Sequence, residues 1–367
     1  MKTRDMKAQE ALAMSAKAAT LWQRLNDKDP LVSAHLFMGH ISHTIAYINS
    51  ISSKPITSVE EFINNLRQPI CEWLPVPDAF TLINRFGVTE FAEDIVSESS
   101  GNLIDELNQK QIKDAKDRLA SMPDGDLHYT RFRKGLIENP VAQPKSIHSF
   151  LNITGCNFRD LYEPLPSNVL LDGTSDYFPC PRCKWPMQIK KGEIVRCASN
   201  QCVKEGAHYS LSKGKLSSLG ALPAPASEDG VSCYRLVRGI WRHTVLSGLS
   251  ELELANKLEQ LPGVTVVMWP FVDEFDLEVT YDSGDSMAKH TWRVDVKDWS
   301  RESRLAANIQ GHSHYQELCY VIPDYRRKQL KYLEERFKSS PMITFHTSSK
   351  FVQMVKKYIK RLSNEPF

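Results

Sequence analysis

Long apolar segments are missing from this sequence. No stretch approaches the roughly 20 consecutive apolar residues that a membrane-spanning helix needs. Charged residues also interrupt the first thirty positions, which therefore lack the unbroken apolar core of a secretory signal peptide. These charged residues are Lys2, Arg4, Asp5, Lys7, Glu10 and Lys17, among others. We therefore expect a cytoplasmic protein with no membrane association.

A large net charge is also missing. Lysine and arginine total 46 against 44 acidic residues, so the formal net charge is only +2 and gives no global signature of nucleic-acid binding. The distribution is uneven, because residues 321–367 hold 11 basic and 4 acidic side chains. Such a patch would contact the phosphates of a polyanion, and solvated helix faces are the alternative. The candidate nucleic-acid-binding residues are Arg326, Arg327, Lys328, Lys356 and Lys357.

Glycine-rich nucleotide loops are absent as well. Neither a P-loop nor a dinucleotide-binding fingerprint occurs, so we do not expect the chain itself to hydrolyse ATP. Its 367 residues, 41% hydrophobic and 25% charged, suit a globular protein of two or three domains. We expect domains at 1–145, 146–221 and 230–367, with the Pro- and Ala-rich segment Leu222–Gly230 as an exposed linker.

The first domain has the apolar spacing of an all-helical region. Predicted helices cover residues 5–25, 31–51, 59–66 and 104–120. One of them contains His35, His40 and His43, two of which could bind a metal at i and i+3. Packed or solvated histidines are favoured, because no acidic partner lies nearby. Segment Tyr129–Val141 mixes aromatic and basic residues, and we expect a helix that packs its aromatic face, with nucleic-acid contact as the alternative.

Cysteine is scarce, but half of the eight residues are grouped. Cys180 and Cys183 form a C-x2-C pair, and Cys197 and Cys202 a looser C-x4-C pair. Two such pairs around a short strand-forming segment are typical of a zinc ribbon, in which four thiolates bind structural Zn2+. Disulfides or coincidental cysteines are the alternatives. The ribbon could contact nucleic acid, contact a partner protein, or brace its neighbours.

Two segments near the carboxyl-terminal end alternate apolar and polar residues, at 271–281 and 292–299. Turn-forming residues between them predict an antiparallel hairpin. Its polar face would then carry Asp276, Asp295 and Lys297, since alternate residues of a strand share one side. Glu278 lies on this face too, where a solvated strand glutamate is the favoured interpretation.

Two carboxylates and an ammonium group on one face suit phosphodiester hydrolysis. Carboxylates hold Mg2+, which is completed by waters and substrate phosphate. The metal polarises the phosphate and lowers the pKa of a bound water, while a lysine stabilises charge or orients that water. An amphipathic hairpin with a solvated charged face is the alternative from periodicity alone.

The sequences DEFDLEV and WRVDVKDW resemble the active-site hairpin of the PD-(D/E)xK nuclease superfamily, which has the restriction-endonuclease-like fold. The flanking pattern fits its core order: a helix opened by a capping box at Ser250–Glu253, a buried strand at 264–269, the hairpin, then a helix at 301–316, a strand at 318–322 and a helix at 325–338. The resemblance covers about residues 230–367. It implies an α/β fold there and an α+β chain overall.

This resemblance implies roles for individual residues. Asp276 matches the first acidic metal ligand, Asp295 the second and Lys297 the motif lysine. Glu251 or Glu253 matches the acidic residue that some members place on the first helix. The carbonyl of Val296 would be a further ligand of Mg2+ or Mn2+. One departure is that Phe275, and not proline, precedes Asp276.

A finer resemblance extends upstream. The order of YTRFRKGLIENPV, CPRCKWPM and GLSELELANKL is similar to that of zinc-ribbon restriction-endonuclease-like proteins encoded beside helicases and PIWI-type proteins in bacterial defence islands. It implies a nuclease that acts on invading DNA with a helicase and a PIWI-type partner.

We therefore expect a metal-dependent DNA endonuclease. The alternative is a non-catalytic nucleic-acid-binding or assembly subunit that uses the ribbon and the basic carboxyl-terminal helices, and a third class is an RNA-processing zinc protein. Cleavage of both strands usually needs two active sites, which favours a homodimer or a larger complex.

Overall fold

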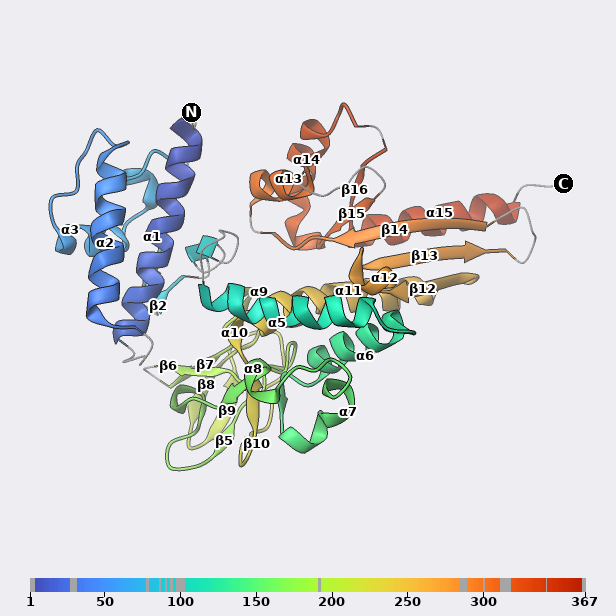
Figure 1. Ribbon diagram of the computed structural model, residues 1–367, viewed down its shortest axis with the longest axis horizontal. Coiled ribbons are helices and arrows are strands. Elements are labelled where there is room, and N and C mark those ends of the chain that lie inside the picture. The colour runs from blue at the N-terminus through green and yellow to red at the C-terminus, as the bar shows by residue number, and fades with distance from the viewer. Residues whose placement is uncertain are drawn as a thin grey trace. The chain divides into compact units, whose positions relative to one another are not determined.

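The computed structural model describes residues 4–26, 32–76, 79–85, 87–89, 91–92, 95–96, 103–190, 193–283, 289–299, 301–310, 318–340 and 342–364. It contains helices together with antiparallel and mixed sheets, so the expected α+β class is confirmed (Figure 1). Contacts divide the chain into two compact units, residues 1–106 and 107–367. Among the described residues, no helix is both long and apolar enough to cross a membrane.

The first unit is built on the three helices predicted for it, and it also contains short strands. Its elements are α1 (Arg4–Asn26), α2 (Ala34–Asn49), α3 (Val59–Asn65), η1 (Ile70–Glu72), β1 (Ile83–Asn84) and β2 (Gly87–Val88). Serine caps open two helices: Ser33 accepts a hydrogen bond from the Leu36 N–H, and Ser58 from that of Glu61. Because β1 pairs with β2, the expectation of an all-helical region is wrong in this detail.

The first half of the second unit consists of two helices followed by short strands and turns. Its elements are α5 (Leu103–Ala120), α6 (Gly125–Glu138), β3 (Val141–Ala142), η2 (Pro144–Ser146), α7 (His148–Leu151), α8 (Phe158–Leu161), β4 (Tyr162–Pro164), η3 (Ser167–Val169), β5 (Asp176–Tyr177), β6 (Gln188–Lys190), β7 (Ile194–Arg196), α9 (Asn200–Lys204), β8 (His208–Ser212), β9 (Lys215–Ser218), β10 (Glu228–Asp229) and β11 (Tyr234–Leu236). Strands β6 to β9 form an antiparallel sheet beside the grouped cysteines.

The second half is a five-stranded sheet with helices packed against it. Its elements are α10 (Arg238–Ile240), η4 (Trp241–Leu246), α11 (Ser247–Glu259), β12 (Val264–Met268), α12 (Pro270–Asp273), β13 (Leu277–Asp282), β14 (Lys289–Val296), α13 (Glu302–Gln310), β15 (Cys319–Ile322), η6 (Asp324–Gln329), α14 (Leu330–Arg336), β16 (Thr344–Thr347) and α15 (Ser348–Asn364). The strand order is β12-β13-β14-β15-β16, with antiparallel pairing up to β14 and parallel pairing beyond it.

The two faces of this sheet are covered differently. On one face, apolar residues of β12 to β15 pack against α11 and α15 (Figure 1). The residues that α15 contributes include Phe351, Val355 and Ile359, which recur at helical spacing. On the other face, α13 and α14 pack against Tyr320 and Phe345 of β15 and β16. The polar face of β12 to β14 remains partly exposed, which positions the charged ends of the hairpin beside open surface.

Two local expectations need correction, and a third is described only in part. The helix carrying Glu251 does not begin at a capping box, because helical backbone runs from Arg238 and Ser250 is buried within it. The strand at 264–269 is not buried on both faces, because β12 is the sheet edge and Val267 is exposed. The predicted helix at 301–316 is described only as far as Gln310, and residues 311–317 lie outside the described part.

One apolar core crosses both predicted domain junctions. It includes Phe132 of α6, Trp185 beside the grouped cysteines, and Trp241 at the start of the helical run that leads to α11. The rings of Trp185 and Trp241 stack with centroids 4.3 Å apart. The predicted boundaries at 145 and 222–230 stay a prediction, but the packing ties the segments on either side of them together.

Because Trp241 is only 1% exposed in this shared core, Trp241→Ala should lower the free energy of unfolding by about 3–5 kcal/mol. Urea denaturation followed by far-ultraviolet circular dichroism would measure the change. The matched control is Leu219→Ala, since Leu219 is 52% exposed and its loss should cost no more than about 0.5 kcal/mol. Equal stabilities for the two variants would contradict a shared core at Trp241.

Candidate functional site

Asp276 and Asp295 lie opposite each other at one end of the predicted hairpin. Asp276 directly precedes β13 and Asp295 lies in β14; their neighbours Leu277 and Val294 are paired in the sheet register. Both aspartates are buried, at 8% and 4% exposure. The Val296 backbone N–H donates a hydrogen bond to Asp276 Oδ2 at 2.6 Å. Burial raises the pKa of Asp276 well above its ordinary value, and the nearby Glu251 and Asp295 carboxylates raise it further.

Lys297 follows the end of β14 and extends the same polar face. Its Nζ lies 2.8 Å from Asp295 Oδ1, and its backbone N–H donates to the Val321 carbonyl of the parallel neighbour β15. Burial alone would lower the pKa of Lys297, but the Asp295 and Asp276 carboxylates raise it above its ordinary value. The side chain is therefore a held cation next to two carboxylates.

Glu251 of α11 is buried in the same cluster, at 1% exposure. Three hydrogen bonds reach its carboxylate. The Trp269 indole N–H donates to Oε2 at 2.6 Å, and Nη2 of Arg133 donates to both oxygens at 2.9 Å. Burial raises the pKa of Glu251, and the charge of Arg133 opposes that rise.

Arg133 comes from α6, more than a hundred residues before Glu251. Besides Glu251 it donates through Nη1 to Asp273 Oδ1, and its Nη2 is 4.0 Å from Asp276 Oδ1, beyond hydrogen-bonding distance. Its guanidinium also lies 4.9 Å from the centre of the Trp269 ring. One buried cation therefore connects the carboxylates of α11, of the segment before β13, and of the turn at α12.

The turn that leads into Asp276 has an unusual backbone. Trp269, Phe271, Val272 and Asp273 all have positive φ, between 50° and 66°, which side chains other than glycine rarely adopt. Helix α6 and the preceding α5 hold this left-handed turn. Tyr129 donates to Asp273 Oδ2, Lys116 to the Asp273 carbonyl, and the Val272 N–H donates to Asp126. Strain of this kind persists only where surrounding contacts enforce it, and it concentrates at functional sites.

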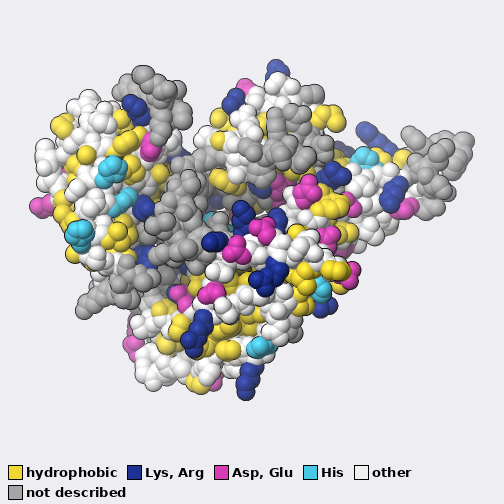
Figure 2. All heavy atoms as spheres, in the orientation of Figure 1, with side chains coloured by type: hydrophobic (Ala, Val, Ile, Leu, Met, Phe, Trp, Pro, Cys, Tyr) yellow, Lys and Arg dark blue, Asp and Glu magenta, His cyan; other side chains and the backbone are white. Residues whose placement is uncertain are grey.

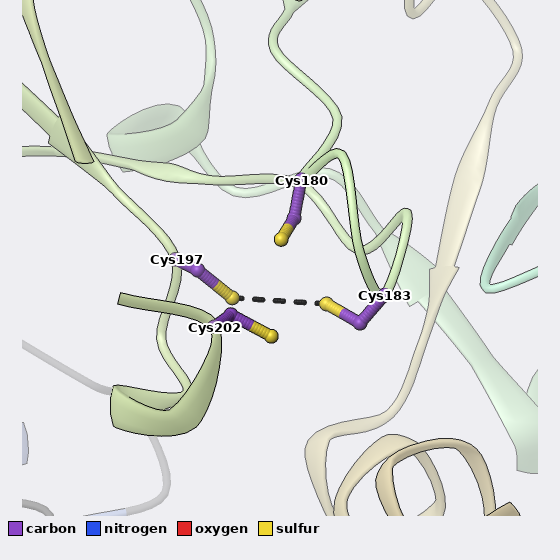
Figure 3. A group of neighbouring side chains, drawn as sticks. All are labelled: Cys180, Cys183, Cys197 and Cys202. Atoms are coloured by element: carbon purple, nitrogen blue, oxygen red, sulfur yellow. Dashed lines mark hydrogen bonds between the residues drawn. The ribbon is translucent and has the colours of Figure 1, made fainter. Parts of the chain in front are cut away.

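The four grouped cysteines form a second site. Cys180 and Cys183 lie in a tight loop in which the Lys184 N–H donates to the Cys180 carbonyl; Cys197 follows β7, and Cys202 lies in α9. All four are buried, their sulfur atoms lie within 4.8 Å of one another, and the side chains point toward a common centre (Figure 3). This buried four-cysteine cluster could bind zinc.

Among the described residues, the carboxylates do not form so compact a group. Asp276, Asp295, Lys297 and Glu251 are nevertheless brought to one end of the hairpin, whereas the basic candidates are spread. Arg326 pairs with Asp298 at 3.0 Å, next to Lys297 in sequence. The other four basic candidates are exposed: Arg327 and Lys328 in η6, and Lys356 and Lys357 in α15. Because α15 packs on the apolar face of the sheet, Lys356 and Lys357 lie away from the carboxylates.

The exposed polar face of β13 and β14 contains a hollow. The hollow, about 520 Å³, is lined by Glu278, Thr280, Lys289, Thr291 and Arg293. These side chains alternate with the buried ones and so share a face with Asp295 and Lys297. Over the described surface that Figure 2 displays, acidic and basic side chains are intermingled, in agreement with the small net charge.

Among the described residues, no group of three or more potential metal ligands includes the histidines of α2. His40 contacts the Met14 carbonyl through Nε2 at 3.0 Å, and burial lowers its pKa. The packed histidine that the sequence favoured is therefore confirmed for His40.

Sequence analysis missed Arg133, Tyr129, Asp273 and Trp269. The segment containing Tyr129 and Arg133 was expected to pack through its aromatic face, and Tyr129 and Phe132 do lie in the shared core. The available signal was the i, i+4 spacing of Tyr129 and Arg133, which places an arginine on that buried face. Nothing in the sequence could show that α6 lies against the turn before β13.

Comparison with known families agrees with the resemblance predicted from the sequence. Residues 248–363 match the family described as "REase associating with pPIWI_RE". The matched segment runs from α11 to α15 and covers about a third of the chain. No curated protein and no solved structure matches the chain significantly. The resemblance to restriction-endonuclease-like proteins associated with pPIWI systems is thus confirmed for this segment.

The left-handed turn predicts an unusual order of stability for substitutions of Phe271. The Phe271 side chain is 58% exposed, and its backbone φ is 55°. Phe271→Gly should be more stable than Phe271→Ala by about 1 kcal/mol, because alanine retains the left-handed strain and glycine does not. This order reverses that of an ordinary helix position, where alanine is the more stable by about 1 kcal/mol. Urea denaturation of both variants measures the difference, and alanine proving the more stable would show that the turn is not left-handed.

Proposed function

We propose that this chain is a metal-dependent nuclease that hydrolyses phosphodiester bonds, and that its substrate is DNA. The observation that carries the proposal is the buried pair Asp276 and Asp295 at one end of β13 and β14, with Lys297 Nζ 2.8 Å from Asp295. The family match over residues 248–363, whose description names an REase, supports it. We assign the same segment to the restriction-endonuclease-like fold, which is supported by the order of α11, the antiparallel β12 to β14 and the parallel β15.

The donor set fits a hard divalent cation. Carboxylate oxygens are the ligands that Mg2+ prefers, and it keeps several waters and substrate oxygens around it. Asp276 and Asp295 would hold Mg2+ or Mn2+, with the carbonyl of Val296 as a further ligand. The raised pKa of Asp276 supports this fit, because bringing carboxylates together under burial is unfavourable without a balancing cation. When bound, the ion would polarise the phosphate and lower the pKa of a water.

The chain's own residues supply orientation and charge. Lys297 would stabilise negative charge on the scissile phosphate or orient the attacking water, since its position beside Asp295 fixes the ammonium group. Glu251 completes the acidic cluster from α11. The hollow on the adjoining sheet face, with Lys289 and Arg293 on its wall, gives a nucleic-acid strand a surface that continues to the carboxylates. Further phosphate contacts would come from Arg326, Arg327 and Lys328, and at a greater distance from Lys356 and Lys357.

The four cysteines would bind structural Zn2+ and form a zinc ribbon. Burial of all four sulfur atoms supports this assignment. No solvent can contact the four neighbouring thiols there, and a bound zinc ion would supply the missing partner. The partners would be a PIWI-type protein, which the family description supports, and a helicase of the same prokaryotic defence system. A cytoplasmic location and a homodimer stay predictions.

Cleavage assays test the nuclease. Purified protein should cut DNA with Mg2+ or Mn2+ and not with EDTA, and Lys297→Ala should reduce the rate by about 100- to 1000-fold because it removes transition-state charge stabilisation. The substrates are supercoiled plasmid, single-stranded DNA and RNA of the same sequence, which also separates a DNA from an RNA enzyme. Lys145→Ala is the matched control, since Lys145 is exposed and lies in η2.

Two outcomes would count against the nuclease. Nucleic-acid binding that persists in Lys297→Ala, with no cutting by any variant under any metal condition, would favour the non-catalytic subunit. If Lys297→Ala cuts as fast as the wild type, the activity belongs to another site or to a contaminant.

Elemental analysis tests the ribbon. The purified chain should contain about one zinc per molecule, and Cys183→Ser should lose it because three thiolates hold zinc less tightly than four. The matched control is Cys71→Ser, since Cys71 is exposed and outside the cluster. Zinc-free wild-type protein that is folded and stable would argue against a structural metal.

A further inference from the structure

Arg133 is placed where a second divalent ion would be expected beside a cluster of carboxylates. It is buried at 8% exposure, and its two terminal nitrogens contact both oxygens of Glu251 and one oxygen of Asp273. Trp269 also donates to Glu251 and Tyr129 to Asp273, and Lys116 Nζ lies 4.0 Å from Asp273 Oδ2. Every oxygen of these two carboxylates therefore already accepts a hydrogen bond from a protein group.

The Asp276 and Asp295 pair is different. Asp276 Oδ1 lies 4.0 Å from Arg133 Nη2, too far for a hydrogen bond, and among the described residues its Oδ2 accepts only the Val296 backbone N–H. Asp295 Oδ1 contacts the ammonium group of Lys297 at 2.8 Å. The planar guanidinium of Arg133 is instead held by hydrogen bonds to two carboxylates and by the Trp269 ring.

From this arrangement we infer that Arg133 is a resident cation that replaces a second metal ion. It keeps Glu251 out of metal coordination, so the site takes a single divalent ion between Asp276 and Asp295. Arg133 is thus a positioning residue for the reaction and not a catalytic one. The inference deepens the proposed function and rests on it.

The charges around Arg133 predict how metal binding should change when this residue is removed. Removing Arg133 would leave Glu251 and Asp273 without their cation, and a divalent ion is the best available replacement for it. A merely structural role predicts the opposite, since a collapsed or misfolded site binds metal less tightly.

Mn2+ binding to the full chain tests this without any need for activity. Titration followed by electron paramagnetic resonance, with the zinc site filled, should give one Mn2+ for the wild type and none for Asp295→Asn. Arg133→Met should gain a second Mn2+ or bind the first about tenfold more tightly, because a positive charge 4.0 Å from Asp276 is removed. The matched control is Arg131→Met, on the exposed side of the same helix, which should behave as wild type.

A second variant covers the case in which Arg133→Met does not fold. Glu251→Gln keeps the shape of the side chain and should still bind one Mn2+, because a carboxylate that already accepts hydrogen bonds from Arg133 and Trp269 is not a ligand. Loss of Mn2+ binding in Glu251→Gln, as in Asp295→Asn, or two Mn2+ ions in the wild type, would overturn the inference while leaving the nuclease intact. A wild type that binds no Mn2+ and cuts nothing would instead refute the proposed function.

Discussion

The ion pair of Arg133 with Glu251 and Asp273 is the contact on which the geometry of the site depends. Burying carboxylates close together is unfavourable, because each loses its hydration and repels the others. A planar guanidinium that reaches both oxygens of Glu251 and one of Asp273 offsets these costs and also fixes direction. Breaking one side of such a buried network leaves an uncompensated charge, so its members hold one another in place.

The same contact explains how a strained turn can survive beside the carboxylates. Left-handed backbone costs roughly 1–2 kcal/mol at each residue other than glycine. The turn at Trp269–Asp273 has several such residues, and α6 supplies the bonds that hold it through Tyr129, Arg133 and Asp126. Since Asp276 follows after only two residues, the position of one carboxylate depends on a helix far away in the sequence.

The cysteine region contributes to the same scaffold. Trp185, next to the cysteine loop, stacks on Trp241 and donates its indole N–H to the Leu236 carbonyl. Arg182 of that loop lies 2.7 Å from Glu205 and 3.8 Å from Glu253 on α11. Among the three roles that the sequence left open for a ribbon, these contacts favour bracing, because they support the helix that carries Glu251.

Local patterns predicted the hairpin well, because strand alternation has a period that a sequence displays directly. The pairing of β13 with β14, the shared face of Asp295 and Lys297, and the gathering of four cysteines all follow from spacing. The start of α11 was missed, because the apolar residues from Arg238 onward continue the helix upstream of Ser250. Arg133 was missed for a stronger reason: contacts between α6 and α12 are set by tertiary packing, which no local pattern records.

The packing of α6 also shows that the candidate site does not end where the family match ends. The matched segment begins at residue 248, but Gly248 lies against Ile137 of α6, where an added Cβ would meet the Ile137 side chain at 2.3 Å. Glycine lets the two helices approach closely there, and one of them is outside the match. The sheet and its acidic residues thus belong to the matched segment, while the cation that balances them does not. The candidate site is therefore larger than the segment that sequence similarity identifies, and it extends back at least to α6.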